Sequence, residues 1–344
     1  MRTAFGQQFD VPDGYLNTAS IGTPSVAVAE AVERAVREWR TGAGRADEFD
    51  ESVALARRGF AALIGAETDR VAIGAAVSPL IGLVAASVPD GSRVLVAAGE
   101  FTSVSFPFAA QAGRGVTVTE LPLDEVGSRA ADFDVVAVSV VQSADGRIVD
   151  LEALRRARAS GTRVVLDVTQ AAGWMPLDLG WADAVAGAGY KWLLSPRGVA
   201  WMAVRPEWEL VPHAAGWYAG ADPWDSIYGL PLRLAGDARS LDTSPVWFGH
   251  VGAAVALPWL ASLDLTAVRS HSVGLADSFR SGLGLEPAGS AIVSVQQPDA
   301  LRRLSDAGLV VAGRAGGARL SFHLYNTEAD VEAALDALCR TSRS

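Results

Sequence analysis

The sequence predicts an α/β fold, with a large doubly wound domain built on a mostly parallel sheet and a smaller α+β domain after it. Short apolar runs rich in β-branched residues alternate with helical patterns up to about residue 205, which is typical of such a sheet. From about residue 245 this alternation stops. The length of 344 residues suits one large domain or two. We therefore expect an N-terminal segment over residues 1–14, a large domain over residues 15–244 and a small domain over residues 245–344.

The expected elements of the large domain follow in order. Two amphipathic helices come first, over residues 25–40 and 48–64. Buried strands are expected over residues 71–76, 92–98, 115–122, 134–141, 162–168, 183–189 and 198–204. A helix over 78–87 would have Ser78 as its N-cap and Pro79 in its first turn, and one over 150–161 would start at Asp150 and stop at Gly161.

The C-terminal part predicts two helices, over residues 247–263 and then to about residue 282. Strands are expected over 291–297, 308–314 and 318–326, with helices between and after them. Before them lies an aromatic, Gly- and Pro-rich loop over residues 211–231. A long irregular loop in a compact domain is often functional, although a surface excursion or an interface explains it as well.

The composition limits the partners. The formal net charge is −10, whereas nucleic acids and acidic membranes are bound by basic patches, so we expect neither partner. No run of 18 apolar residues predicts a membrane span, and the first residues lack the apolar core of a signal peptide. Cys339 is the single cysteine, which excludes an intrachain disulfide. We expect a cytoplasmic protein.

Lys191 is the only lysine, whereas the chain has 28 arginines. It lies in the apolar stretch GAGYKWLL instead of in a charged segment. Arginine can replace lysine at most exposed sites but not where an amine must act as a nucleophile, because guanidinium stays protonated. Lys191 is therefore either a reactive amine or a lysine without a chemical role, whose aliphatic stem covers an apolar patch.

Asp167 closes the predicted strand VVLDV, and Lys191 follows the next strand. Ligands of parallel α/β sheets bind beyond the carboxyl ends of the strands, where both side chains would meet. They could form a plain ion pair. They could also hold opposite ends of pyridoxal 5′-phosphate (PLP), whose aldehyde needs an amine and whose ring nitrogen needs a carboxylate.

The segment of residues 164–202 (VVLDVTQAAGWMPLDLGWADAVAGAGYKWLLSPRGVAWM) resembles the cofactor region of the class V aminotransferase family of PLP enzymes. YLNTAS at 15–20 and RLSFHLYNTEADVEAALDAL at 319–338 resemble the family's N- and C-terminal segments. The resemblance implies the fold type I architecture, PLP as cofactor, and a homodimer with active sites composed of both subunits.

The resemblance also implies roles around the cofactor ring. Lys191 would form a Schiff base with PLP, and Asp167 would pair with the pyridinium nitrogen. Gln170 would hydrogen-bond the ring hydroxyl, and Ser143 would lie nearby. Phe101 falls where many relatives have a histidine stacked on the ring, so it keeps the stacking surface without an acid or base.

Other residues are carried over for the phosphate. Val77 and Ser78 match the phosphate-binding turn, where the backbone N–H groups of a helix start favour an anion. Ser244 matches a phosphate ligand donated by the other subunit, and Thr243 is its close rival. Ala188 stands where many relatives have a serine or threonine that bonds the phosphate.

Substrate contacts are expected from four residues. Arg319 matches the arginine that grips the substrate carboxylate, although an exposed strand arginine is the alternative. His213, Trp217 and Tyr218 lie in the aromatic loop and could line a substrate pocket. The two aromatic residues could equally pack in the core or at a dimer interface.

These parts predict a PLP-dependent aminotransferase acting on an amino acid or amine. A carbon–sulfur β-elimination lyase is the first alternative, and a non-catalytic PLP-fold binding protein is the second. Cysteine desulfurases of the family place a catalytic cysteine before the RxS segment, but here VVAGRAGGARLSF has none. Tyr190 also replaces the family's usual histidine before the lysine. The histidines show no metal-ligand spacing, so no metal is expected.

Overall fold

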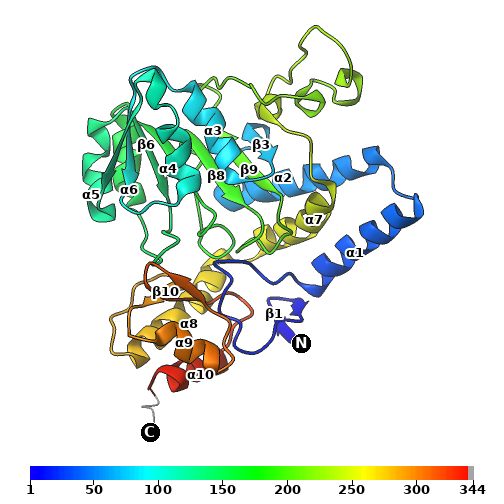
Figure 1. Cartoon of the computed structure of the whole chain (residues 1–344). Coiled ribbons are helices and arrows are strands. Elements are labelled where there is room, and N and C mark those ends of the chain that lie inside the picture. Colours follow the sequence, from blue (N-terminus) through cyan, green and yellow to red (C-terminus); the bar gives the residue numbers. More distant parts are fainter. Residues whose placement is uncertain (340–344) are drawn as a thin grey trace.

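The computed structural model describes residues 1–339, and its larger part is built on one mixed sheet (Figure 1). In the described chain this sheet has the strand order β3–β9–β8–β7–β6–β4–β5. The pairs from β5 to β8 are parallel, and β9 runs antiparallel to both β8 and β3. The bounds are β3 (Val71–Gly74), β4 (Arg93–Ala97), β5 (Thr117–Leu121), β6 (Val135–Ser139), β7 (Arg163–Asp167), β8 (Ala184–Ala188) and β9 (Ala200–Val204). The expected strands and the mostly parallel sheet are confirmed.

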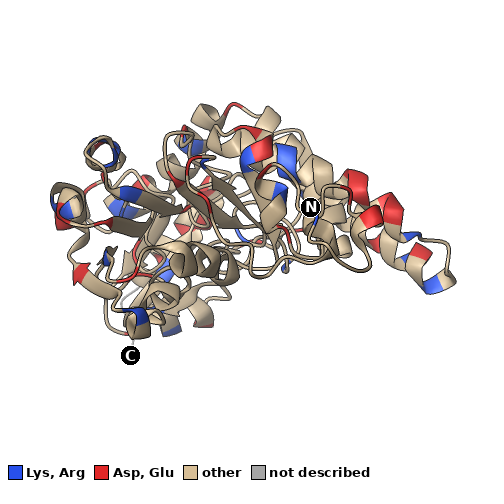
Figure 2. Ribbon diagram, turned by 90° about the horizontal axis from the view of Figure 1, so that it is seen from above, with Lys and Arg blue, Asp and Glu red and all other residues tan. Residues whose placement is uncertain are grey.

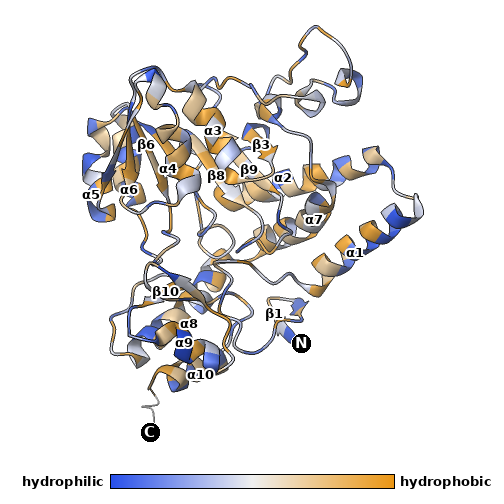
Figure 3. Ribbon diagram, viewed as in Figure 1, coloured by the Kyte–Doolittle hydropathy of each residue, from blue (hydrophilic) through white to orange (hydrophobic). Residues whose placement is uncertain are grey.

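Helices cover both faces of this sheet (Figure 1). Their bounds are α1 (Val26–Thr41), α2 (Asp50–Ile64), α3 (Val77–Ser87), α4 (Thr102–Ala109), α5 (Leu123–Arg129) and α6 (Leu151–Ala159). Strands β6, β8 and β9 are buried along their whole length, because helices lie above and below them. The apolar residues gather on these strands and on the inner faces of the helices (Figure 3).

Two predicted helix starts have different outcomes. Asp150 is the N-cap of α6, and its side chain accepts a 2.9 Å hydrogen bond from the Ala153 N–H, as predicted. The prediction of Ser78 as an N-cap is wrong. The extended residue before α3 is Ala76, so the helix begins at Val77 and Ser78 lies inside its first turn. Ala76 has no polar side chain that could cap α3, so the first N–H groups of the helix stay available to another acceptor.

The C-terminal part packs three helices on a small sheet. Its strands, in the order β10–β12–β11, are β10 (Ile292–Val295), β12 (Gly317–Ser321) and β11 (Ala312–Arg314). Its helices are α8 (Leu265–Gly282), α9 (Ala300–Asp306) and α10 (Glu328–Cys339), and α7 (Trp247–Ser262) connects it to the large part. Helix α7 lies close to α2, since a Cβ at Gly59 would stand 2.6 Å from Leu257 Cβ. The sequence predicts all of these helices and strands except the exact bounds.

The N-terminal residues tie the two parts together. A hairpin of β1 (Arg2–Ala4) and β2 (Gln7–Phe9), which the sequence does not predict, opens the chain. Arg2 forms a 2.6 Å ion pair with Asp330 of α10. Further on, Asn17 makes a bridge with Ser321 of β12. The division at residues 14–15 and 244–245 stays a prediction.

Short 3₁₀ helices fill the remaining turns. They are η1 (Ala46–Phe49), η2 (Thr68–Arg70), η3 (Ala112–Arg114), η4 (Ala130–Asp132), η5 (Trp217–Ala219), η6 (Trp224–Ser226) and η7 (Ala238–Leu241). The aromatic loop that contains η5 and η6 projects from the body of the molecule, as does the hairpin of α1 and α2 (Figure 1). Acidic and basic residues are interspersed along the ribbon in Figure 2. Among residues 1–339, no single helix has both the length and the apolar composition to cross a membrane; α7 and α8 pass that test only when joined, and they meet at 94°.

Candidate active site

A cavity of about 280 Å³ lies at the carboxyl ends of the central parallel strands. The loops after β4, β6, β7 and β8 and the start of α3 form its walls, as expected for an open α/β sheet. The lining residues are Ala75, Ala76, Val77, Ser78, Phe101, Thr102, Ser103, Ser139, Ser143, Asp167, Thr169, Gln170, Ala188, Tyr190, Lys191 and Arg197. Most of the cofactor residues expected from the sequence therefore meet in one place.

Lys191 lies three residues beyond the end of β8 and is 5 % exposed. Its Nζ stands 5.2 Å from the centre of the Phe101 ring and 5.6 Å from that of Tyr190. Within the described residues, Nζ has no hydrogen-bond or ion-pair partner. Burial disfavours the charged amine and lowers the pKa of Lys191 to about 8, against the opposing attraction of Asp167. The amine is therefore accessible in its neutral, nucleophilic form near neutral pH.

Asp167 is the last residue of β7 and faces the same cavity. One carboxylate oxygen accepts a 2.7 Å hydrogen bond from the Thr169 N–H. Burial raises the pKa of Asp167, while the bonds from Thr169 and the charge of Lys191 lower it. A buried carboxylate without an ion-pair partner among residues 1–339 is costly unless a ligand cation joins it. Asp167 thus fits a partner that carries a positive ring nitrogen.

Gln170 connects the walls of the cavity. Its side-chain amide donates to the Ser143 hydroxyl and to the Ala19 carbonyl, both at 3.0 Å. Its oxygen accepts a 2.7 Å hydrogen bond from the Trp192 indole N–H. All the hydrogen-bonding groups of this amide except one lone pair are therefore occupied, which fixes Gln170 at the cavity wall.

The start of α3 presents backbone N–H groups to the cavity. Ala76 offers no side-chain cap, and Val77 and Ser78 line the cavity. The first N–H groups of a helix have no partner within the helix and carry partial positive charge. The arrangement suits an anion such as phosphate, with the Ser78 hydroxyl as a further donor.

Arg319 lies behind the cavity wall on β12 and is 2 % exposed. Its guanidinium donates to the Ser143 carbonyl at 2.5 Å, the Ser143 hydroxyl at 3.1 Å and the Ser20 hydroxyl at 2.7 Å. Burial, with the charge of Arg314, lowers the pKa of Arg319 to about 10, so it stays cationic at neutral pH. All its partners in the described chain are neutral, and the positive charge remains available to an anion.

The other expected residues do not line this cavity. His213 is exposed on the aromatic loop. Trp217 donates a 2.7 Å hydrogen bond to the Ser244 hydroxyl, beside Thr243. The Tyr218 hydroxyl lies 3.0 Å from an Asp50 carboxylate oxygen, and burial raises its pKa. Their roles toward substrate or phosphate stay predictions.

Glu100, Thr169 and Arg197 are among the residues at the site that the sequence does not indicate. Glu100 is buried after β4 and accepts hydrogen bonds from the Ser139 N–H and hydroxyl at 2.9 and 2.6 Å and from the Phe101 N–H at 2.8 Å. Thr169 accepts a 3.1 Å bond from the Ala188 N–H. The Arg197 guanidinium lies 4.9 Å above the Tyr190 ring at the cavity edge. Their position directly after strands or beside Lys191 is the signal that could have indicated them.

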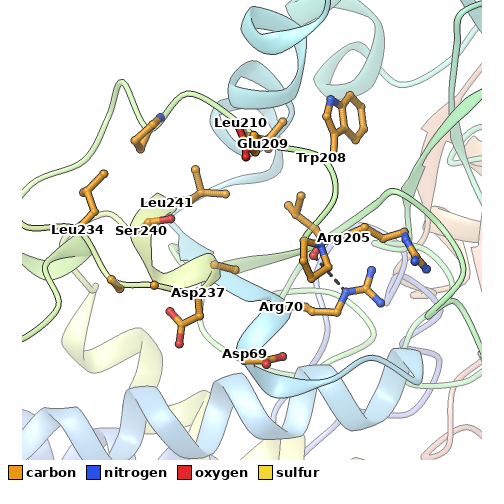
Figure 4. Close-up of a pocket in the computed structure, with 16 residues that line it drawn as sticks. Asp69, Arg70, Arg205, Trp208, Glu209, Leu210, Leu234, Asp237, Ser240 and Leu241 are labelled. Atoms are coloured by element: carbon orange, nitrogen blue, oxygen red, sulfur yellow. Dashed lines mark hydrogen bonds between the residues drawn. The ribbon is translucent and has the colours of Figure 1, made fainter.

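A larger cavity of about 600 Å³ lies beside the end of β9 (Figure 4). Arg70 lines it and donates to the Val204 and Gly180 carbonyls at 3.1 and 2.8 Å. Arg205, which also lines it, is paired with Glu207. These charged groups already have partners, and no expected catalytic residue is present, so the cavity around Lys191 is the candidate active site.

The comparisons with known proteins agree with this geometry. The family model of the class-V aminotransferases matches residues 27–307. An uncharacterized aminotransferase of Bacillus subtilis, YcbU, is 29 % identical in an alignment of length 341 that covers 91 % of each chain. An isopenicillin N epimerase of Amycolatopsis lactamdurans is 28 % identical over 84 % of each chain. The cysteine desulfurase CsdA of Escherichia coli is 24 % identical over 95 % of this chain and 93 % of its own.

Solved structures share the fold. The cystine C–S lyase C-DES, in complex with its product cysteine persulfide, has a TM-score of 0.85 at 18 % identity, covering 96 % of this chain and 98 % of its own. A variant of C-DES with glycine covalently linked to the PLP cofactor has a TM-score of 0.86 at 17 % identity, covering 96 % and 97 %. The fold type I architecture is thereby confirmed. The chain belongs to the class-V aminotransferase family of PLP-dependent enzymes.

Proposed function

We propose that this enzyme is an aminotransferase that binds PLP through Lys191 and takes an amino acid as substrate. The observation that carries the proposal is that one cavity holds both an amine whose lowered pKa favours its neutral form and a carboxylate that has no ion-pair partner among residues 1–339. Lys191 has a pKa of about 8 and no hydrogen-bond partner in the described chain, and Asp167 faces it from the neighbouring strand. An aldehyde and a protonated ring nitrogen would satisfy both groups at once.

The donor set of the cavity fits the rest of the cofactor. Val77 and Ser78 would hold the phosphate with the uncapped start of α3. Phe101 would cover one face of the ring, and Ser143 or Gln170 would meet the ring hydroxyl. When bound, PLP supplies a conjugated ring that accepts the electron pair left at the substrate's α-carbon.

The residues of this chain would then carry out the proton movements. Lys191 Nζ would take the proton from the α-carbon of the substrate and later return a proton, a task suited to an amine with a pKa near the working pH. Asp167 would keep the ring nitrogen protonated by its negative charge. Arg319 would hold the substrate carboxylate by exchanging its present bond to Ser20 or Ser143.

A homodimer is part of the proposal. Ser244 is exposed and does not line the cavity of its own chain. Its hydroxyl accepts the Trp217 bond but keeps its own proton, which it would donate at the site of a second copy. The projecting aromatic loop also exposes a group of large apolar side chains, which a partner subunit would cover. They are Trp224, Ile227, Tyr228 and Leu230, with Leu232 directly after the loop. Light scattering coupled to size-exclusion chromatography measures the assembly, and a monomer at micromolar concentration would remove this part of the proposal.

The test of the reaction is a keto-acid assay on the PLP-loaded protein with a panel of amino acids. An aminotransferase forms the keto acid of its substrate catalytically only when a second keto acid is present as acceptor. Continuous keto-acid formation without an acceptor would indicate the β-elimination lyase instead. A protein that binds PLP but turns over no amino acid or amine with any acceptor would support the non-catalytic alternative.

A further inference from the structure

The small sheet has two different faces. On β12, Ala318 and Leu320 belong to the apolar cluster shared with α8, α9 and α10. Side chains alternate along a strand, so Arg319 and Ser321 lie on the other face. There Ser321 accepts a 3.0 Å hydrogen bond from the Ala19 N–H, and Arg319 contacts the cavity wall. This second face of the small sheet therefore looks toward the active site.

Arg314 belongs to this same face. In the β11–β12 pairing, Ala312 stands opposite Arg319 and Arg314 stands opposite Gly317. Residues two apart on a strand share a face, so Arg314, opposite Gly317, lies on the same face as Arg319. It is the diagonal neighbour of Arg319, at a Cα–Cα distance of roughly 7–8 Å. Gly317 has no side chain beyond its Cα, so nothing on β12 covers Arg314 from directly opposite.

Neither arginine has an acidic partner in the part of the chain that the structure describes. Arg314 is exposed and donates only to the carbonyl of its neighbour Gly313, at 2.7 Å. The partners of Arg319 are Ser143 and Ser20. In contrast, other arginines are neutralised, such as Arg57 by Asp242 at 2.6 Å.

Arg314 and Arg319, diagonal neighbours on one face of the small sheet, carry like charges that repel each other. The charge of Arg314 contributes to lowering the pKa of both Arg319 and Lys191, so its field reaches the active site. An anionic ligand would offset this repulsion. One carboxylate at Arg319 leaves Arg314 unpaired, whereas a ligand with two acid groups satisfies both.

We propose that Arg314 binds a second acid group of the substrate, so that the enzyme selects amino acids with an acidic side chain. The inference rests on the proposed function, in which Arg319 takes the α-carboxylate. Arg314 is then a specificity-determining residue, placed by the short turn between β11 and β12.

The experiment measures dissociation constants of unreactive acids for the PLP-loaded protein by calorimetry. Glutarate carries two carboxylates and butyrate carries one, and neither has an amino group that can react. We expect glutarate to bind the wild type roughly ten- to a hundredfold more tightly than butyrate, as one charge-assisted contact provides. Arg314→Gln should abolish this preference and leave the affinity for butyrate unchanged.

Two further variants and one control sharpen the test. Arg314→Lys, which keeps the charge without the fork, should keep part of the preference. Arg302→Gln, on the exposed side of α9 and paired with Asp299, should keep all of it. Arg197→Gln tests the exposed arginine that lines the cavity itself, and loss of the preference there but not in Arg314→Gln would overturn the proposal.

Equal affinity of the wild type for glutarate and butyrate would also overturn it. So would a tenfold loss of PLP affinity in Arg314→Gln, measured by equilibrium dialysis, since Arg314 would then serve the cofactor phosphate. Because these acids cannot react, the outcome does not depend on transamination. A protein that prefers glutarate through Arg314 but transfers no amino group would refute only the proposed reaction.

Discussion

The side-chain oxygen of Gln170 accepts a 2.7 Å hydrogen bond from the indole N–H of Trp192. Gln170 follows Asp167 by three residues, and Trp192 follows Lys191 directly. The bond therefore locks together the two loops that carry the candidate catalytic residues. The fixed loops hold Asp167 and Lys191 on the same cavity before any ligand arrives, and this preorganisation is useful to a catalyst.

Replacing Gln170 by leucine should destabilise the protein. The change leaves the buried Trp192 N–H without its acceptor and removes the donor to the Ala19 carbonyl. Each unsatisfied buried group costs about 1–3 kcal/mol, so the free energy of unfolding should fall by roughly 2–5 kcal/mol. Urea unfolding measures it, with the exposed Gln297→Leu as control. A loss no larger than in the control would contradict the locking role.

Lys191→Met should stabilise the cofactor-free protein, and the gain should depend on pH. Below pH 8 the buried amine is charged in both states, so burial destabilises the wild type fully, by up to about 3 kcal/mol. Between pH 8 and about 10.4 the folded amine loses its proton while the unfolded one keeps it, and the wild type gains stability. Urea unfolding at pH 7 and pH 10 should therefore show the advantage of the variant shrinking. A constant difference would mean that the amine is not perturbed by burial.

Asp167→Asn should separate stability from function. The asparagine keeps an acceptor for the Thr169 N–H but removes a buried charge, so the cofactor-free protein should be more stable at pH 7. The advantage should disappear as the pH falls and the raised-pKa carboxyl of the wild type becomes protonated. Catalysis should fall by roughly a hundredfold or more, because the ring nitrogen loses its counter-charge. Unchanged turnover would exclude contact between Asp167 and the cofactor.

Glu100→Ala should disturb the Phe101 loop. The carboxylate collects hydrogen bonds from Ser139 and from the Phe101 N–H, and the alanine leaves these buried donors unpaired. We expect the free energy of unfolding to fall by roughly 2–4 kcal/mol. The affinity for PLP should fall too, as read by equilibrium dialysis. Glu120→Ala, at an exposed position of β5, is the matched control, and equal effects of the two changes would remove the role of Glu100.

The sequence predicts those features that depend on local pattern or strand adjacency. The meeting of Asp167 and Lys191 follows from the parallel pairing of β7 with β8, in which Asp167 stands opposite Ala186. Helix α6 starts at Asp150 because aspartate caps its own first turn. These features need only neighbouring residues and the edge rule for parallel sheets.

Long-range packing decides what the sequence does not predict. Strands β1 and β2 are too short for a periodic signal, and Arg2 finds Asp330 at the far end of the chain. In the sequence, Glu100 is an ordinary charged residue in a turn. Only the fold brings Ser139, the last residue of β6, within hydrogen-bond distance of it. The start of α3 is shifted because the extended Ala76 leads out of β3, which leaves Ser78 inside the helix.

The most direct measurement is the site of covalent attachment of PLP. Because Lys191 is the only lysine, borohydride can fix the cofactor only there or at the chain's terminal amine. Peptide mass mapping of the reduced protein should place the label on the peptide with Lys191 in the wild type and find none in Lys191→Ala. A label confined to the N-terminal peptide, or equal labelling of Lys191→Ala, would contradict the assignment of Lys191 as the cofactor lysine.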